Sequence, residues 1–308
     1  MREQLKDRLS SLAENRIQWD CPLAPYTSFG IGGPASALVT VESIAELLRL
    51  LQCLVENNLD WRVIGRGTNL LVADSGFAGV IFILGKGLSQ IALQEEAESG
   101  QVLIRVGAGC SLARLLAWCM DEGLSGLEFV SGIPGSVGGA VVMNAGAWGG
   151  EMADVIVSLT TVSPYEGEKI LGREELKFSY RLWENPEKSG AKSMVVAADL
   201  ELRNGLKKEI AARCREYLQK RLQKQPKGLK NAGSFFKNPP GDSAGRLIEA
   251  SGLKGTRCGG AMISAVHANF LVNSGQATAK DVLQLMELVR EKVAKDSGIT
   301  LETEVHFL

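Results

Sequence analysis

The sequence predicts an α+β protein with two domains, a larger α+β N-terminal domain and a smaller α/β C-terminal domain. The chain has 308 residues, which corresponds to about two domains of roughly 150 residues each. Its 45% hydrophobic and 22% charged residues are typical of a folded globular protein. Short strand patterns alternate with helical ones up to about residue 204, and the composition shifts near Gly205. We therefore expect an N-terminal helix and connection over residues 1–20, followed by domains over residues 21–204 and 205–308.

Hydrophobic periodicity places the elements of the N-terminal domain. A helix is expected over residues 44–56, because Ser43 and Glu46 form a capping-box pair in front of a Leu-rich segment. Another helix should follow Ser111. Its apolar face consists of Leu112, Leu115, Leu116 and Cys119. The expected strands are residues 35–41, 61–64, 80–84, 102–106, 155–157, 159–162 and 194–198.

The C-terminal domain has two predicted helices and a terminal strand. The first helix covers about residues 206–222. It should pack through Ile210, Cys214, Tyr217 and Leu218. The second begins at the cap formed by Thr278 and Asp281 and runs to about Lys295. Residues 301–307 alternate as a strand. Leu301, Val305 and Phe307 should face one side, and Glu302, Glu304 and His306 the other.

Composition excludes several classes of function. A net charge of −1 argues against a protein that binds nucleic acid through a basic surface. Two histidines and six cysteines without a CxxC pair predict no metal centre and buried free thiols. The charged N-terminus lacks a signal peptide, which predicts a cytoplasmic location. Residues 129–150 carry no charge, but seven of them are glycine, so we expect no membrane insertion.

Glycine is the unusual feature of the composition. The chain has 35 glycines, of which 18 lie in residues 65–150 and seven in residues 231–260. Glycine is required where the backbone takes a positive φ or lies directly against a ligand. The two clusters therefore predict two stretches of close backbone approach.

Three segments are candidate binding loops. Residues 65–71, GRGTNLL, follow a strand and can present backbone N–H groups to an anion, although an ordinary turn is the alternative. No lysine follows, so the segment is not a nucleotide-hydrolysing P-loop. Residues 131–147 could wrap a large flat cofactor or form a tightly packed crossover. Gly30 begins a GxGxxA match, but a strand follows it instead of a helix, which argues against a dinucleotide-binding turn.

The C-terminal domain adds polar candidates. Ser234 stands between a glycine and two aromatic residues, where a serine in a turn is the ordinary interpretation. Residues 207–230 contain nine Lys and Arg against two Glu, and such a local basic patch suits a phosphorylated substrate. His267 is more often a structural histidine than a base.

Seven segments in this order resemble one known family, the UDP-N-acetylenolpyruvoylglucosamine reductases (UDP-N-acetylmuramate dehydrogenases). The resemblance covers almost the whole chain, from about residue 20 to 308. The segments are residues 26–33, 65–71, 131–139, 178–181, 231–236, 267–270 and 301–305.

The resemblance implies an NADP-linked, flavin-dependent oxidoreductase of the bacterial cytoplasm. It would reduce UDP-N-acetylglucosamine enolpyruvate to UDP-N-acetylmuramate for peptidoglycan, using tightly bound, non-covalent FAD and NADPH. Its FAD-binding domain would be of the vanillyl-alcohol-oxidase type, in two subdomains, beside a substrate-binding domain. The implied catalytic residues are Arg181, Ser234 and Glu304.

The resemblance also implies binding residues. The FAD-binding positions would be Gly65, Arg66, Gly67, Thr68, Asn69 and Leu70 in the first loop. In the second segment they would be Ser131, Gly132, Ile133, Pro134, Gly135, Ser136, Gly138, Gly139, Asn144, Ala145 and Gly146. Tyr180, Asn238 and either Arg221 or Lys224 would contact the substrate, the last of these at the diphosphate.

Three features set this sequence apart within the resemblance. Gly30 stands where a basic residue is expected, which would loosen that loop, and His306 stands where arginine is expected beside Glu304. The short segment between Arg181 and Met194 is similar to the shorter-loop (type II) branch. A flavin oxidase of the same fold and a non-catalytic nucleotide-sugar sensor are the alternatives. Neither histidine lies in the flavin segments, which argues against an oxidase that attaches FAD through histidine. The presence of Arg181, Ser234 and Glu304 together argues against a sensor.

Overall fold

The computed structural model describes residues 3–185 and 193–308, which form two compact units. Unit 1 contains Met1–Trp19, Ser36–Gly65 and Gly79–Gln219, and unit 2 contains Asp20–Ala35, Arg66–Ala78 and Lys220–Leu308. The chain therefore passes between the units several times. The boundary expected near residue 205 precedes helix α5 (Lys207–Lys224), whereas this division falls inside the helix.

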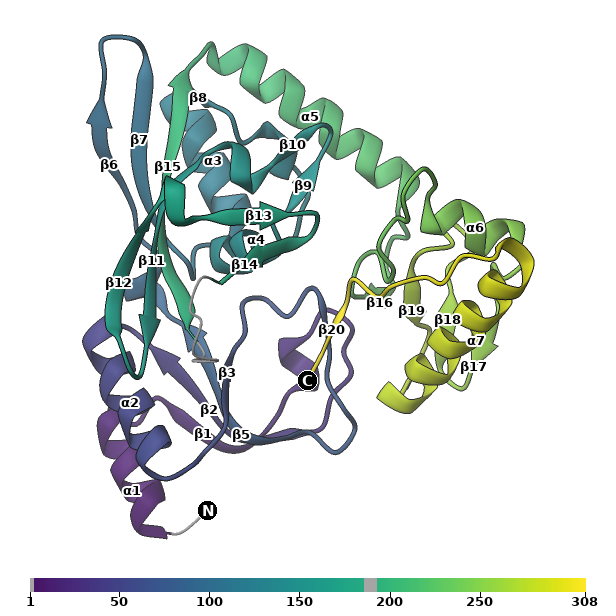
Figure 1. The fold of residues 1–308 in the computed structure, drawn as a ribbon, viewed down its shortest axis with the longest axis horizontal. Helices are drawn as coiled ribbons and strands as arrows, with labels where there is room; N and C mark the ends of the chain where they lie inside the picture. Colours follow the sequence, from purple (N-terminus) through teal and green to yellow (C-terminus); the bar gives the residue numbers. More distant parts are fainter. Residues whose placement is uncertain (1–2, 186–192) are drawn as a thin grey trace. The chain divides into compact units, whose positions relative to one another are not determined.

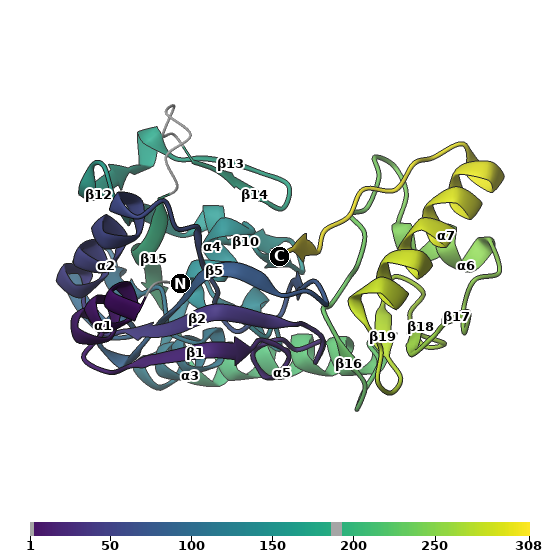
Figure 2. The same cartoon turned by 90° about the horizontal axis from the view of Figure 1, so that it is seen from below.

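Unit 1 contains a four-stranded sheet with helices beside it (Figures 1 and 2). The strand order is β1 (Ile17–Pro22), β2 (Pro34–Val41), β5 (Phe77–Leu84) and β3 (Trp61–Val63). Helices α1 (Glu3–Leu12) and α2 (Ile44–Glu56) bury Leu9, Leu47, Leu50 and Leu54 in the same core as these strands. Strand β5 lies between β2 and β3 and is parallel to β3.

The second sheet of unit 1 is antiparallel. Its order is β12 (Gly167–Gly172), β11 (Ile156–Ser163), β15 (Met194–Asn204), β7 (Gln101–Gly107) and β6 (Ile91–Glu96), with β8 (Leu124–Ser125) paired to β15. Helices α3 (Leu112–Glu122) and α4 (Val137–Val142) share one hydrophobic core with this sheet, and Figure 1 shows them beside it. The buried residues of α3 are Leu112, Leu115, Leu116 and Cys119, as expected from the sequence.

The chain also contains short elements outside these two sheets. Two hairpins are formed by β9 (Gly146–Ala147) with β10 (Gly150–Glu151), and by β13 (Lys177–Ser179) with β14 (Leu182–Glu184). The 3-10 helices are η1 (Ala24–Tyr26), η2 (Lys86–Leu88), η3 (Glu128–Val130), η4 (Met152–Asp154) and η5 (Arg173–Glu175).

Unit 2 packs two helices on a small antiparallel sheet. The order is β16 (Lys230–Asn231), β19 (Leu271–Asn273), β18 (Ala261–Ile263) and β17 (Arg257–Cys258). Helices α6 (Ala244–Ala250) and α7 (Ala279–Ser297) bury Leu247, Val282, Leu285 and Val289 in its core. Strand β4 (Leu70–Leu71) pairs in parallel with β20 (His306–Phe307).

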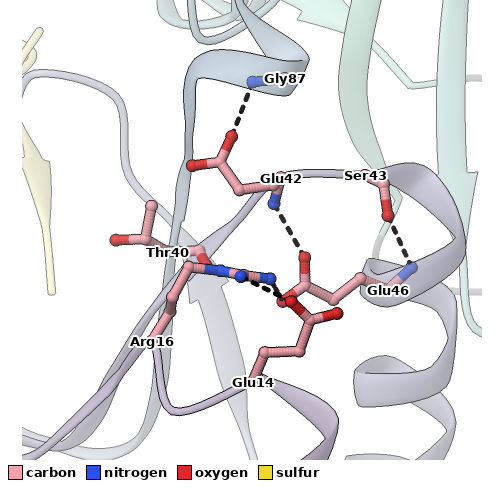
Figure 3. Close-up of polar contacts among 7 residues, drawn as sticks. All are labelled: Glu14, Arg16, Thr40, Glu42, Ser43, Glu46 and Gly87. Carbon is pink, nitrogen blue, oxygen red and sulfur yellow. Dashed lines mark hydrogen bonds and ion pairs between the residues drawn. The ribbon is translucent and has the colours of Figure 1, made fainter.

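Polar bonds fix the start of α2 (Figure 3). Ser43 Oγ accepts the Glu46 N–H at 3.2 Å, as predicted, but the Glu46 carboxylate accepts the Glu42 N–H at 2.9 Å and not that of Ser43. Glu46 is 2% exposed and also pairs with Arg16 at 2.7 Å. Glu42 in turn accepts the Gly87 N–H at 2.6 Å. In place of the expected capping box, the structure has an N-cap at Ser43 and an ion pair between Arg16 and the buried Glu46.

The structure corrects several expected elements. Strands β1 and β6 were not expected. The strand predicted over residues 301–307 is reduced to β20 and a bridge between Phe236 and Thr303. Leu301 and Val305 are buried, whereas Phe307, which was predicted to share their face, is 49% exposed. Leu218 is 40% exposed, so α5 packs mainly through Ile210 and Cys214. Within residues 3–185 and 193–308, no helix combines the length and apolarity of a membrane span.

Candidate active site

The first glycine loop contains both packed and exposed positions. A Cβ on Gly65 would overlap the hydroxyl of Ser136, so the two predicted cofactor segments come into contact at Gly65, within unit 1. In unit 2, Gly67 has φ of 60°, and a Cβ there would overlap the Tyr26 carbonyl. Gly65 and Arg66 are exposed, whereas Gly67 is buried. Part of the glycine surplus thus serves packing within the protein.

The second glycine segment leads into α4 in unit 1. Ser136 caps the helix by accepting the Gly139 N–H at 3.3 Å. Gly132, Pro134 and Gly139 are exposed. A Cβ on Gly138 would meet Ala108 at 2.9 Å, so Gly138 also has a packing role.

A tight turn in unit 1 carries Tyr180 and Arg181. The β13–β14 hairpin pairs Ser179 with Leu182, which leaves Tyr180 and Arg181 as the two turn residues. Arg181 has φ of 61°, a backbone region that costs a long side chain energy and is frequent at functional sites. Its guanidinium lies 5.0 Å from the Tyr180 ring centroid and contacts the Gly146 carbonyl at 3.4 Å.

Asn144 is buried below that turn. Its side chain is fully buried, donates from Nδ2 to the Ser179 carbonyl at 3.2 Å and accepts the Ala153 N–H on Oδ1 at 3.0 Å. The sequence indicates Asn144 as an FAD-binding position. In the structure both polar groups of its side chain instead bond to protein backbone.

Ser234 and Glu304 lie on adjacent segments of unit 2. The Glu304 N–H donates to the Phe235 carbonyl at 2.9 Å, and Phe236 bridges Thr303. Ser234 is therefore one residue from a position directly opposite Glu304. Within the described residues the Ser234 hydroxyl makes no hydrogen bond, so its proton is available to a bound molecule. The backbone segments that carry these two predicted catalytic residues are therefore adjacent.

Asn69 connects the first glycine loop to the Glu304 segment. Its Nδ2 donates to the Glu304 carbonyl at 3.0 Å, and its own carbonyl accepts the His306 N–H at 3.1 Å. Both contacts lie within unit 2. The loop that the sequence assigns to FAD therefore also fixes the backbone on both sides of Val305.

Asn269 holds the Ser234 segment and was not a candidate from the sequence. It is 2% exposed, accepts the Phe236 N–H at 2.9 Å and donates to the Phe236 carbonyl at 2.8 Å. Its backbone carbonyl accepts the Phe235 N–H at 2.8 Å. The sequence signal was its place in the HANF segment, which carried the resemblance without indicating a role.

His267 supports Asn269. Its Nδ1 accepts the Asn269 N–H at 3.2 Å, and its ring packs edge-on against Phe270 at 5.0 Å. Burial lowers the pKa of His267, and the positive charge of Lys254 lowers it further. A neutral ring suits this acceptor role, in agreement with the structural interpretation of His267 from the sequence.

The predicted substrate contacts lie at the end of α5 and before α6. Arg221 is half-buried and Lys224 exposed, both in the last turn of α5. Asn238 is exposed, and its Oδ1 accepts the Ala244 N–H at 3.1 Å at the start of α6. Asn238 therefore has a capping role whether or not it also contacts substrate.

Lys230 lies over Gly30. A Cβ on Gly30, which has φ of 65°, would stand 2.6 Å from Lys230 Cδ. The space beside Gly30 is thus filled by a lysine from another segment of unit 2, and the loop is held further by Ser28 Oγ, which donates to the Asn231 carbonyl at 2.6 Å.

A cavity of about 750 Å³ lies elsewhere in unit 1. Its charged lining residues are Glu151, Asp154, Arg173, Lys177 and Glu184. None of the predicted site residues lines it. The exposed glycine segments therefore define the candidate site better than this cavity.

The residues present fit a flavin dinucleotide. Exposed backbone at Gly65, Gly132 and Gly139 allows a large planar ligand to approach closely. Arg66 adds an exposed cation beside the loop for a pyrophosphate. No group of three His, Cys, Asp or Glu suitable for a metal ion occurs among the described residues.

The comparisons first define the class: the chain contains an FAD-binding domain, with the fold of the vanillyl-alcohol-oxidase type. The family model "FAD binding domain" matches residues 35–170. In fold, the chain is similar to a VAO-type flavoprotein from Myceliophthora thermophila, with a TM-score of 0.52 and 11% identity over 66% of this chain and 48% of that chain.

Whole-chain comparisons identify the family. The family model "UDP-N-acetylenolpyruvoylglucosamine reductase, C-terminal domain" matches residues 225–308. The reductase of that name from Syntrophus aciditrophicus is 43% identical, over 99% of this chain and 96% of the relative. The crystal structure of the reductase from Thermus caldophilus has a TM-score of 0.77 and 41% identity, over 94% of this chain and 97% of that chain. The chain belongs to the UDP-N-acetylenolpyruvoylglucosamine reductase family.

Proposed function

We propose that the chain reduces UDP-N-acetylglucosamine enolpyruvate to UDP-N-acetylmuramate with FAD and NADPH, a step of peptidoglycan precursor synthesis in the bacterial cytoplasm. The observation that carries the proposal is the position of Ser234 beside the Glu304 segment. The Ser234 hydroxyl makes no hydrogen bond to any described residue. Family membership supports the reaction, and six free thiols suit a reducing compartment.

The substrate chemistry explains the need for Arg181. When a hydride adds to the outer carbon of the enolpyruvyl double bond, negative charge develops on the inner carbon and its carboxylate. A planar guanidinium pairs with a carboxylate in two places, so Arg181 would stabilise this charge. The positive φ of Arg181 keeps the charged group on a two-residue turn.

The inner carbon then requires a proton. Serine is a weak acid in water, so Ser234 can donate only to a strongly basic carbon against which its hydroxyl is already aligned. The new C–H bond forms as the Ser234 O–H bond breaks. Glu304, on the adjacent segment, would orient the hydroxyl and return a proton to the serine oxygen.

The cofactor would be held by residues 65–70 and 131–146. When bound, FAD supplies the hydride transfer from NADPH to substrate. Arg66 would neutralise its pyrophosphate. Tyr180, Asn238 and the cations at the end of α5 would bind the substrate, with Arg221 or Lys224 at its diphosphate.

An absorption spectrum tests the cofactor. Purified protein loaded with FAD should show a flavin spectrum after removal of free FAD by gel filtration. Retention of the flavin supports the proposal, and a protein that stays colourless after loading contradicts it. A covalently attached flavin, which would survive denaturation and precipitation with the protein, contradicts the non-covalent mode.

Anaerobic stopped-flow measurements test the reaction. NADPH should bleach the flavin, and the enolpyruvyl sugar nucleotide should restore its absorbance. Ser234→Ala should preserve bleaching by NADPH and slow restoration by about 100-fold or more, because only restoration needs the proton. The control is Ser99→Ala, an exposed serine in the turn between β6 and β7, which should behave like the wild type.

Three outcomes would overturn the assignment. Failure of the substrate to restore the flavin excludes the reductase. Rapid restoration by oxygen alone favours an oxidase of the same fold. Equal loss of both half-reactions in Ser234→Ala excludes the proton-donor role.

A further inference from the structure

Asn144 lies where three segments of unit 1 meet. It follows α4, its Nδ2 bonds to the Ser179 carbonyl, and its Oδ1 bonds to the Ala153 N–H at the start of η4. Ser179 is the last residue of β13 before the turn that carries Arg181. The Asn144 side chain therefore holds the hairpin one residue from its turn.

The backbone of Asn144 explains why asparagine fits here. Helix α4 ends in a Schellman motif, because the Asn144 N–H donates to the Val141 carbonyl at 3.0 Å and the Ala145 N–H to the Ala140 carbonyl at 2.8 Å. The motif requires positive φ at Asn144, which is 39°. Besides glycine, asparagine is the residue that tolerates this conformation best.

The same short segment contacts the other side of the turn. Two residues after Asn144, the Gly146 carbonyl lies 3.4 Å from Arg181 Nη1. One contact thus fixes the backbone before the turn, and another limits the direction of the guanidinium. Residues 144–146 form the base on which the turn of Tyr180 and Arg181 rests.

We propose that Asn144 is a positioning residue that sets the place of Arg181 for the substrate carboxylate through its bond to Ser179. The inference rests on the proposed function for the carboxylate, but the positioning of the turn can be measured without turnover. In this role the buried side chain of Asn144 acts through its bond to the hairpin and not through contact with FAD.

Asn144→Asp replaces the Nδ2 donor with an oxygen of similar size and, when the carboxyl group is ionised, adds a negative charge. One carboxylate oxygen can still accept the Ala153 N–H, while the other faces the Ser179 carbonyl and repels it. A protonated carboxyl group can donate to that carbonyl again, so lowering the pH restores the bond. Burial raises the pKa of a carboxyl group, which brings this recovery within reach of mildly acidic buffer.

The expected result is a selective and reversible defect. At pH 8, restoration of the reduced flavin by the enolpyruvyl sugar nucleotide should slow by about 10- to 100-fold, the cost of displacing a catalytic group by a fraction of an ångström to 1 Å. Relative to wild type at the same pH, the rate should recover as the pH falls to 6. Bleaching by NADPH and the flavin spectrum should stay within about two-fold of wild type.

Two further variants separate the effect of the Asn144 side-chain bonds from that of its backbone conformation and of the substitution itself. Asn144→Gly keeps the positive φ and loses both side-chain bonds, so it should be slow at pH 8 and should not recover at pH 6. Asn57→Asp is the matched control. Asn57 ends α2 and donates from Nδ2 to the Cys53 carbonyl at 2.8 Å, so Asn57→Asp loses a bond of the same kind at an exposed position outside the site. It should react like the wild type at both pH values.

Hydrogen exchange distinguishes failure of this inference from failure of the proposed function. In Asn144→Asp at pH 8, amides of the β13–β14 hairpin should exchange faster than in wild type, whatever the substrate is. Unchanged exchange, equal loss of both half-reactions, or a defect that persists at pH 6 overturns the positioning role. Altered hairpin exchange in an enzyme that the sugar nucleotide never reoxidises would contradict the proposed function alone.

Discussion

At the residue scale, each proposed catalytic residue lies next to backbone that an asparagine side chain holds. An amide group has both a donor and an acceptor, so it can bond to backbone as another strand would. The three contacts are Asn69 to Glu304, Asn144 to Ser179, and Asn269 to Phe236. Each of these contacts is made to the main chain and not to a proposed catalytic side chain.

Gly30 gives a residue-scale prediction. Gly30→Ala would adopt a strained positive φ and also meet Lys230, so we expect it to lower the free energy of unfolding by about 2 kcal/mol. Gly228→Ala is the control, since Gly228 has φ of 73° with nothing within 4 Å of its Cβ position. This substitution should lower the free energy of unfolding by about 1 kcal/mol, the cost of the strained backbone alone.

A double-mutant cycle by urea unfolding measures the contact. In a Lys230→Ala background, Gly30→Ala should cost about as much as Gly228→Ala, because its steric partner is gone. Costs that are the same with and without Lys230 would contradict the packing inferred from the structure. If the contact between Gly30 and Lys230 stabilises the wild-type protein, the expectation that glycine loosens this loop is wrong.

The candidate site could be predicted from the sequence only in part. Ser234 and Glu304 were predicted because short segments in a fixed order carry the resemblance. The proposed roles of Asn269 and Asn144 were not predicted. Asn269 bonds to Phe236, 33 residues away, and Asn144 bonds to Ser179, 35 residues away. The tertiary fold, and not the local sequence, brings these partners together. Side-chain bonds to distant backbone leave no pattern along the chain.

At the element scale, helices were predicted more accurately than strands. Helix α2 has the expected bounds, and α7 begins at the expected capping box of Thr278 and Asp281. Caps and helical periodicity are local, so a sequence reveals them. Strand β6 was missed because five of its six residues are exposed, and residues 301–305 alternate without forming a ladder. Strand pairing depends on partners distant in the sequence.

The ion pair at the start of α2 gives a prediction for that element (Figure 3). Glu46→Ala removes the carboxylate that accepts from Arg16 and from the Glu42 N–H, and it leaves both donors beside the core. We expect a loss of about 2–4 kcal/mol in the free energy of unfolding, discounted for the partial exposure of Arg16.

The matched control is the outer partner of the same arginine. Glu14 bonds to Arg16 at 2.9 Å, but its side chain is 67% exposed. Glu14→Ala should therefore change the free energy of unfolding by less than about 0.5 kcal/mol. Urea unfolding followed by circular dichroism compares the two variants. Similar losses would mean that burial does not decide the strength of these pairs.

At the scale of the whole molecule, the two units divide the proposed catalytic residues. Arg181 belongs to unit 1, and Ser234 and Glu304 belong to unit 2. The segment Arg66–Ala78 belongs to unit 2 although the chain on both sides of it belongs to unit 1. A single boundary near residue 205 could not describe this exchange, because composition changes along the chain reveal only consecutive domains.

The pH dependence of stability is a further property of the whole molecule. Burial lowers the pKa of His267, and Lys254 lowers it further; partial burial and Lys237 lower the pKa of His306. Both rings therefore bind a proton more weakly in the folded chain than in the unfolded one, where the pKa is about 6.5. Their stabilising contribution is complete above that value and is lost as the pH falls from it toward the folded pKa values.

We expect the free energy of unfolding to fall between pH 7 and about pH 5, before carboxylates titrate. His267→Asn should flatten this slope, because the amide oxygen can accept the Asn269 N–H near the place of Nδ1 and does not titrate. His306→Asn should flatten it less, since His306 keeps more contact with water than His267, and water screens the charge of the ring. Urea unfolding at four pH values measures the slopes. If wild type and His267→Asn run parallel, the neutral ring does not support the Ser234 segment, because protonation would then leave its bond to Asn269 without effect.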